Sequence, residues 1–230
     1  MTSYCFNYLL LKMSRISNDE LIINHPYVRK EGYIDYHGKK VGIKYIQPRN
    51  TTATIIAIGG TGGGFYGPSY IYDELAETLP DIGFSVLRVD VSPDHLNGAE
   101  NVLIGLEFLK KLNNFNPILL MGWSMGGASI IQVAKYLQET GEFQINGLIT
   151  LAGQSYGANP VSELYNIPIY IFHGTADTCM GPNVAKSIYR MANEPKELYL
   201  LKGASHFMNE KDYELKQLVY DCIFRSFFTN

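Results

Sequence analysis

One pentapeptide constrains the fold of this chain more than any other feature. Residues 122–126 read Gly-Trp-Ser-Met-Gly, and they follow directly on the apolar run Ile118–Met121. A helical pattern begins right after them, so the sequence predicts a buried strand, a sharp turn and a helix. Glycines give such a turn the dihedral angles and the close backbone approach that it needs. The turn pushes the hydroxyl of Ser124 out of the sheet, toward the positive end of the following helix.

This placement suits a serine nucleophile, because a carbonyl can be attacked there and the backbone N–H of Met125 can hold the resulting oxyanion. In a chain with 22 glycines, the same Gly-x-Ser-x-Gly pattern also arises by chance. A serine hydroxyl is a weak nucleophile that needs a general base, and the base needs an orienting carboxylate. The rest of the sequence decides whether Ser124 has both.

Size and charge bound the class of protein. The chain has 230 residues, of which 46% are hydrophobic, enough for one sizeable core. A net charge of -3 favours neither nucleic acid nor an anionic membrane as partner. The three cysteines are widely spaced and form no disulfide framework or metal motif. This usage indicates a reducing compartment, and we expect a cytoplasmic protein.

Residues 1–31 are expected to form an N-terminal extension, followed by a single domain over residues 32–230. The apolar stretch Tyr4–Leu11 is too short to span a bilayer and lacks the flanks of a signal peptide, so no integral membrane segment is predicted. Met13 is an alternative start to Met1.

Strand and helix patterns alternate along the domain. Residues 32–47 read as a hairpin, and further strands are predicted over 54–58, 84–89, 118–121, 145–151, 167–172 and 197–201. Helices are predicted over 69–79 with Ser69 as cap, from Asn97 or Asp94 to about Leu112, over 124–139 up to Gly141, over 182–191, and after Asn209 as cap. This order predicts an α/β fold, a mainly parallel sheet with helices on both faces.

Two histidines in the second half of the chain follow predicted strands. His173 precedes Gly174 and reads as a structural residue that holds a turn, whereas His206 lies just before the last helix. Asp177 is the leading carboxylate, in the loop after the 167–172 strand. Functional groups gather beyond the carboxyl ends of parallel strands, so we expect Ser124, Asp177 and His206 to meet there as nucleophile, acid and base.

The loops that carry these residues resemble those of the α/β-hydrolase superfamily. Gly122–Gly127 resembles the nucleophile elbow of serine esterases, and the three groups occur in the chain order of that superfamily. His173–Asp177 and Gly203–Phe207 are similar to the acid and histidine loops of dienelactone-hydrolase-like and small carboxylesterase members. The resemblance covers the chain from about residue 32 to its end.

The resemblance implies an α/β-hydrolase fold with an eight-stranded sheet and a covalent acyl-enzyme mechanism, for which no metal or organic cofactor is needed. The chain differs from the family pattern at two places. Dienelactone hydrolases usually carry cysteine where this chain has Ser124, and many members have His-Gly where it has Gly59-Gly60.

By family position, the loop over residues 59–67 supplies the second oxyanion donor. Its sequence is Gly-Gly-Thr-Gly-Gly-Gly-Phe-Tyr-Gly, with the backbone N–H of Thr61 as the first candidate and that of Gly62 as the alternative. The N–H of Met125 is the other expected donor. Removing one such donor typically lowers turnover on the order of 100-fold or more.

The segment Ala152–Asn166 is too short for a large lid, so a minimal lid and an open site are expected. Apolar walls there would favour an acyl or aryl group over a sugar or a phosphate. The candidate substrate-binding side chains flank the predicted catalytic loops or belong to this segment: Phe65, Tyr66, Trp123, Tyr156, Met180 and Phe207.

The sequence therefore predicts a serine hydrolase that acts on a small-molecule ester or thioester. One alternative is a nicotinamide-dependent oxidoreductase of Rossmann type, because Gly62-x-Gly64-x-x-Gly67 matches a dinucleotide-binding pattern and Asp90 ends the next strand. The pattern begins several residues past its strand, however, and this alternative leaves the serine, aspartate and histidine unexplained. A ligand-binding protein on a hydrolase scaffold is the third hypothesis.

Overall fold

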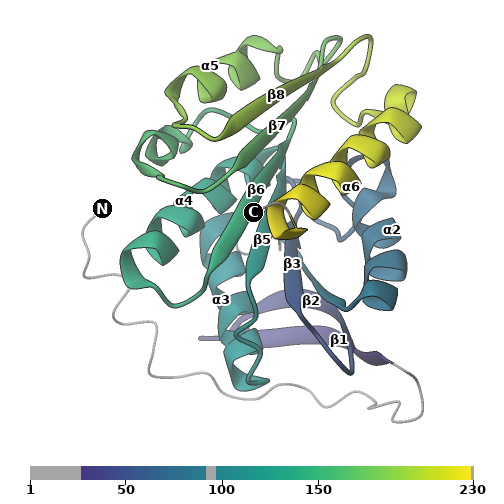
Figure 1. Ribbon diagram of the computed structural model, residues 1–230, viewed down its shortest axis with the longest axis vertical. Helices are drawn as coiled ribbons and strands as arrows, with labels where there is room; N and C mark the ends of the chain where they lie inside the picture. Colours follow the sequence, from purple (N-terminus) through teal and green to yellow (C-terminus); the bar gives the residue numbers. More distant parts are fainter. Residues whose placement is uncertain (1–26, 92–96, 229–230) are drawn as a thin grey trace.

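The computed structural model describes residues 27–91 and 97–228 (Figure 1). Most of the expected N-terminal extension, both candidate start residues Met1 and Met13, and the alternative helix cap Asp94 lie outside the described residues. The strands are β1 (Tyr27–Tyr36), β2 (Lys39–Pro48), β3 (Ala53–Ile58), β4 (Phe84–Val89), β5 (Ile118–Trp123), β6 (Ile145–Leu151), β7 (Ile169–Gly174) and β8 (Lys196–Leu201). The α-helices are α2 (Ile71–Thr78), α3 (Gly98–Lys111), α4 (Met125–Thr140), α5 (Asn183–Met191) and α6 (Asp212–Phe228). Short 3₁₀ turns are η1 (Pro68–Tyr70), η2 (Leu79–Ile82), η3 (Asn159–Glu163) and η4 (Asn209–Lys211).

The eight strands form one sheet in the spatial order β1-β2-β4-β3-β5-β6-β7-β8. Strands β1 and β2 form the expected antiparallel hairpin, although β1 begins at Tyr27 rather than at residue 32. β2 also runs antiparallel to β4, and every pairing from β4 to β8 is parallel. The predicted α/β fold with an eight-stranded, mainly parallel sheet is confirmed.

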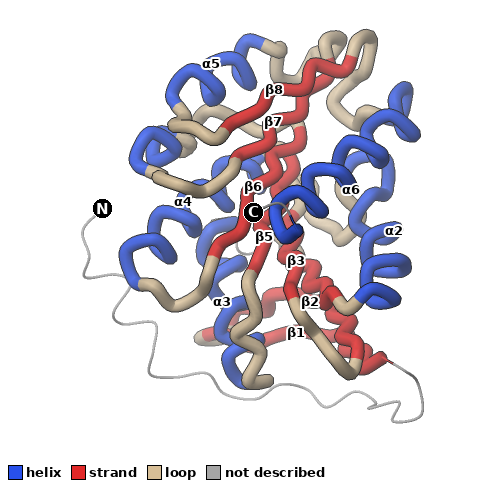
Figure 2. The backbone as a smooth tube through the Cα atoms, in the orientation of Figure 1, coloured by secondary structure: helices blue, strands red, loops and turns tan. Residues whose placement is uncertain are grey.

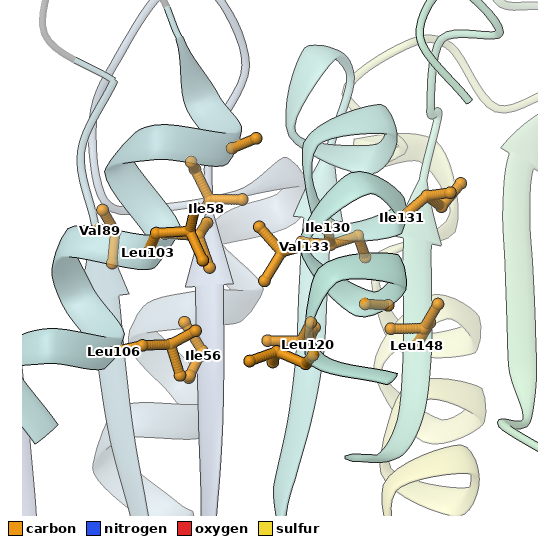
Figure 3. Packing of buried hydrophobic residues seen from close by; sticks show 14 of the residues in the cluster. Ile56, Ile58, Val89, Leu103, Leu106, Leu120, Ile130, Ile131, Val133 and Leu148 are labelled. Atoms are coloured by element: carbon orange, nitrogen blue, oxygen red, sulfur yellow. The ribbon is translucent and has the colours of Figure 1, made fainter. Parts of the chain in front are cut away.

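Helices cover both faces of the sheet. Figures 1 and 2 show α3, α4 and α5 on one face and α2 and α6 on the other. Side chains alternate between the faces along each strand, so Ile56 and Leu120 belong to the first core cluster while Ile55 and Leu119 belong to the second. Figure 3 shows the first cluster, in which Leu106 of α3 lies beside Ile56. Each fully buried leucine or isoleucine stabilises the fold by about 1.5–3 kcal/mol.

Local caps explain some helix ends, and tertiary contacts override others. The Asn97 side chain accepts from the N–H of Glu100 and opens α3, and Gly141 ends α4 in the left-handed region at φ 67°. The predicted caps Ser69 and Asn209 are wrong. Ser69 sits at φ 52° inside η1 and its hydroxyl donates to Asn209 Oδ1 at 3.3 Å, while Asn209 begins η4 rather than α6. The two side chains therefore bond to each other, between loops far apart in the chain, instead of to the helix ends that follow them.

Tyr72 holds both ends of the glycine-rich loop that follows β3. Its buried hydroxyl donates to Ile58 O at 3.0 Å, where β3 ends, and its N–H donates to Tyr66 O at 3.0 Å. A Cβ added to Gly67 would lie 2.8 Å from the Tyr72 ring, so the ring also requires glycine there. Burial raises the pKa of the Tyr72 phenol, which therefore stays a neutral donor.

We expect Tyr72→Phe to lower the free energy of unfolding by about 1–3 kcal/mol, because the change leaves the buried Ile58 carbonyl without this donor and opens no cavity. Urea denaturation measures the loss. The matched control is Tyr70→Phe, at a neighbouring ring that is 67% exposed, and it leaves the midpoint unchanged. Equal stability of the two variants would contradict the anchoring role of Tyr72.

Candidate active site

Ser124 occupies the sharp turn between β5 and α4. Its backbone has φ 56° and ψ -118°, a conformation that costs a non-glycine residue about 1–3 kcal/mol. Three hydrogen bonds hold the turn. The Ser124 N–H donates to Leu151 O at 2.9 Å, and Ser124 O accepts from Gly127 N at 3.0 Å and from Gln154 N at 3.1 Å. The strand, turn and helix therefore lie as the pentapeptide predicts.

Close backbone contacts explain the glycines around the turn. A Cβ added to Gly122 would lie 2.2 Å from Gly126 O, and one added to Gly126 would lie 2.6 Å from Gly59 O. A Cβ on Gly127 would lie 2.8 Å from the Cα of Gly153. The turn is thus wedged between the loop after β3 and the loop after β6, with no room for a side chain at these positions.

Asp177 and His206 come from the loops after β7 and β8 and meet at the carboxyl edge of the sheet. Nδ1 of His206 donates to Asp177 Oδ2 at 2.7 Å. Asp177 Oδ1 accepts from the N–H groups of Cys179 at 2.8 Å and Met180 at 2.9 Å. Nε2 of the buried His173 lies 2.7 Å from Met180 O and 3.2 Å from Asp177 Oδ2, so its N–H faces both acceptors. His173 thus holds the turn and touches the carboxylate as well.

These donors keep the Asp177 carboxyl ionised. Burial by itself raises the pKa of this carboxyl, but hydrogen bonds from the Met180 N–H, from His206 and from the Cys179 N–H outweigh it. The net pKa of Asp177 lies below its ordinary value of 3.8. A fixed negative charge therefore faces the ring of His206, which holds the Nδ1–H tautomer and leaves Nε2 as the acceptor.

Hydrogen bonds at Ser205 and at the carbonyl of His206 fix the histidine loop. The N–H and the hydroxyl of Ser205 both donate to Glu210 Oε2 at 3.0 Å. The indole N–H of Trp123 donates to His206 O at 3.2 Å, and the centroids of the Trp123 and His206 rings lie 5.5 Å apart. Trp123 precedes Ser124, so it joins the histidine loop to the serine turn. The role of Glu210 was not predicted from the sequence. The signal that could have indicated it is a carboxylate between the histidine loop and the last helix.

No hydrogen bond joins the Ser124 hydroxyl to the His206 ring within residues 27–91 and 97–228. Such bonds are often long in ligand-free sites and tighten only around the reacting substrate. Both residues are partly exposed to solvent.

The glycine-rich loop passes directly beside Ser124. A Cβ added to Gly60 would lie 3.0 Å from Ser124 Cβ and 3.4 Å from its Oγ. The N–H of Gly63 donates to Gly60 O at 3.0 Å and closes a turn with the exposed residues Thr61 and Gly62 at its tip. Met125 follows Ser124 as the first residue of α4, where a helix has no internal acceptor for the N–H. The three expected donors, the N–H groups of Thr61, Gly62 and Met125, thus belong to segments that adjoin Ser124.

Asp90 anchors that loop. Its Oδ1 accepts from the Gly64 N–H at 2.5 Å, and its own backbone is held by Gly42 O at 2.9 Å and by the Asn101 amide at 3.1 Å. The sequence also allowed Asp90 as the ribose-binding carboxylate of a dinucleotide site. The structure favours the anchoring role, because the carboxylate already takes the N–H of a glycine in the same pattern.

The six candidate substrate-binding residues separate into two groups. Trp123 and Phe207 lie together beside His206, with ring centroids 5.1 Å apart, and Phe207 is 51% exposed. Met180 adjoins the acid through its backbone. Tyr66 is exposed and pairs edge-on with Tyr70 at 5.7 Å.

The other two candidates, Phe65 and Tyr156, lie in different surroundings. The Phe65 ring packs against β2, where Lys44 Nζ lies 5.2 Å from the ring centroid and a Cβ added to Gly42 would lie 3.1 Å from Phe65 Cζ. Tyr156 is 87% exposed, in the loop before η3. That loop contains no α-helix, so the expected minimal lid is confirmed.

Comparison with known proteins supports the architecture. The solved structure of Est1E from Butyrivibrio proteoclasticus matches 85% of this chain and 98% of its own, with a TM-score of 0.68 at 20% identity. The chain has the α/β-hydrolase fold. Dienelactone hydrolase from Anabaena variabilis covers 86% of the chain and 97% of its own at TM-score 0.68 and 16% identity. An alpha-beta serine hydrolase homologue from Coxiella burnetii covers 84% and 97% at TM-score 0.68 and 20% identity.

The sequence comparisons match less of the chain than the structure comparisons do. No family model matches the chain. The uncharacterized protein YfhR from Escherichia coli is 26% identical over 185 residues, which cover 68% of this chain and 64% of YfhR. The chain therefore spans under two thirds of the length of that relative.

We expect Gly122→Ala to lower the free energy of unfolding by at least about 3 kcal/mol, because its Cβ meets backbone that cannot give way. Gly62→Ala is the matched control, since a Cβ at Gly62 meets nothing within 4 Å, and it changes stability by less than about 0.5 kcal/mol. Thermal unfolding compares the two. A tolerated Gly122→Ala would show that the turn is looser than described.

The depressed pKa of Asp177 links stability to pH. Its ionised form stabilises the fold above the ordinary value of 3.8, and this contribution is lost as pH falls through the lower folded value. We expect Asp177→Asn to cost about 1–3 kcal/mol at neutral pH, because the amide loses the charge that His206 and His173 face. The gap between wild type and variant should close below the ordinary pKa. Urea unfolding from about pH 7 down to pH 2 measures it, and a constant gap would contradict the assignment.

Proposed function

We propose that this protein is a serine hydrolase that cleaves a carboxylic ester or thioester through an acyl-enzyme intermediate. The observation that carries the proposal is the 2.7 Å hydrogen bond between His206 and the buried Asp177, at the sheet edge where Ser124 sits on a strained turn. A nucleophile on such a turn, a histidine and an ionised orienting carboxylate are the groups that acyl transfer needs. The resemblance of the fold to esterases supports the same reaction class.

Each group has one role in the reaction. Asp177 holds the Nδ1–H of His206, so Nε2 takes the proton of Ser124 as its oxygen attacks the substrate carbonyl. The N–H of Met125 and that of Thr61 or Gly62 stabilise the oxyanion. His206 then gives the proton to the leaving alcohol or thiol. A water molecule, activated in the same way, releases the acid and restores Ser124.

The aromatic side chains beside His206 favour an apolar or aryl acyl group. Trp123 and Phe207 present their rings beside His206, and the segment between β6 and β7 contains no α-helix. One similar structure is described as ferulic acid bound to Est1E, which makes aryl esters the first substrates to test. We infer a small-molecule partner and a cytoplasmic location. None of the described helices is both long and apolar enough to cross a membrane.

A fluorophosphonate probe tests the proposal directly, because it labels only a serine activated as a nucleophile. Wild type should be labelled, whereas Ser124→Ala should show no labelling. Labelling of His206→Ala should fall by at least about 1000-fold, since the base is gone. Ser155→Ala, at an exposed serine in the loop after β6, is the control and should be labelled like wild type.

Circular dichroism and thermal unfolding establish that each variant is folded. A folded wild type that is not labelled would overturn the proposal, as would equal labelling of folded Ser124→Ala. Aryl and aliphatic p-nitrophenyl esters then rank the acyl groups by kcat/KM.

A further inference from the structure

Three metal-ligating side chains converge beside the sheet edge. A carboxylate oxygen of Asp177, the sulfur of Cys179 and a ring nitrogen of His206 all lie within 4.8 Å of one another. This is the only such cluster found among residues 27–91 and 97–228. The proposed hydrolysis uses Asp177 and His206 but leaves the thiol of Cys179 without a role.

We propose that Asp177, Cys179 and His206 form an inhibitory binding site for a borderline-soft divalent cation such as Zn²⁺. A thiolate, an imidazole and a carboxylate are the ligands that zinc takes in proteins, and a hard cation such as Mg²⁺ would avoid the sulfur. Water completes the tetrahedral coordination, so only three protein ligands are required.

The surroundings orient the Asp177 ligand and leave the Cys179 ligand accessible to solvent. The Asp177 side chain has 0% exposure and is oriented by the N–H groups of Cys179 and Met180, while His173 faces it from another side. Such second-layer contacts orient a metal ligand and strengthen its binding. Cys179 is exposed, so a cation can enter from solvent on the side of the thiol.

Small movements bring the ligands to coordination distance. Around a tetrahedral zinc the ligand atoms lie about 3.3–3.6 Å apart. The 2.7 Å separation of Asp177 Oδ2 and His206 Nδ1 must therefore widen. The Cys179 sulfur, which lies at most 4.8 Å from the other two ligand atoms, must turn toward them. Rotation of an exposed cysteine side chain supplies the larger of these movements. By contrast, Cys222 is fully buried and its sulfur lies 3.7 Å from Tyr199 Oη.

Metal binding removes the general base. Nδ1 of His206 carries a proton in the hydrogen bond to Asp177, and a metal needs the lone pair at that nitrogen. The ring proton moves to Nε2, the thiol of Cys179 releases its proton to solvent, and no electron is transferred. Nε2 is then a donor and no longer accepts the proton of Ser124. The cation and the active triad are therefore mutually exclusive.

Titration with Cd²⁺ tests the site, because cadmium is a spectroscopic stand-in for zinc and its bond to a thiolate absorbs in the ultraviolet. The protein carries Cys5→Ser to remove the cysteine outside the described residues. In this background we compare the parent, Cys179→Ala, His206→Ala and, as control, Cys222→Ser. A Ser124→Ala variant is titrated as well, because it tests binding without any hydrolysis.

We expect one Cd²⁺ per chain, bound at least about tenfold more weakly by Cys179→Ala and by His206→Ala than by the parent. Cys222→Ser and Ser124→Ala should bind like the parent. Zn²⁺ should displace Cd²⁺ and should inhibit ester hydrolysis until EDTA is added. Unchanged binding by folded Cys179→Ala, or no saturable absorbance in the parent, would overturn the site.

The absorbance titration stands apart from the proposed hydrolase activity. Binding at Cys179 in a protein that no fluorophosphonate labels would support the metal site and contradict the hydrolase proposal. Labelling without metal binding would do the reverse. Activity that persists when the site is saturated with Zn²⁺ would overturn the inhibitory role.

Discussion

Close backbone contact at the turn after β5 is the constraint on which the rest of the structure depends. Gly122, Gly126 and Gly127 let this turn pass between the loops after β3 and β6 at distances that exclude any side chain. The contact places Ser124 at the carboxyl edge of the central strands and starts α4 directly behind it. Hydrogen bonds from Tyr72 and to Asp90 then hold the glycine-rich loop beside the serine.

A second constraint is the buried carboxylate of Asp177. Its two oxygens take donors from its own loop, from His173 and from His206, so the acid and histidine loops are held together by one charge. These donors offset the cost of burying the charge, because an unpaired buried carboxylate is strongly destabilising. The same lone pairs attract either the proton of an imidazole or a cation, so the proposed catalysis and the proposed metal binding would exclude each other.

Much of the fold could be predicted from the sequence because its signals are local. Continuous apolar runs such as Ile118–Met121 are typical of strands buried on both faces, and Asn97 and Gly141 bound helices through contacts within one turn. Ser69 and Asn209 have the same local character, yet both predictions were wrong. Their side chains bond to each other across 140 positions, and no local pattern carries that contact.

The sequence by itself determined the succession of strands and helices, the strand-turn-helix at Ser124 and the chain order of serine, aspartate and histidine. Only the tertiary structure decided that Asp90 anchors a loop, that Phe65 packs on β2 and that the thiol of Cys179 lies beside the histidine. Periodicity reports which face of an element is buried, whereas these contacts join loops far apart in the chain. Their geometry follows from how the strands are ordered in the sheet, and that order exists only once the whole core has packed.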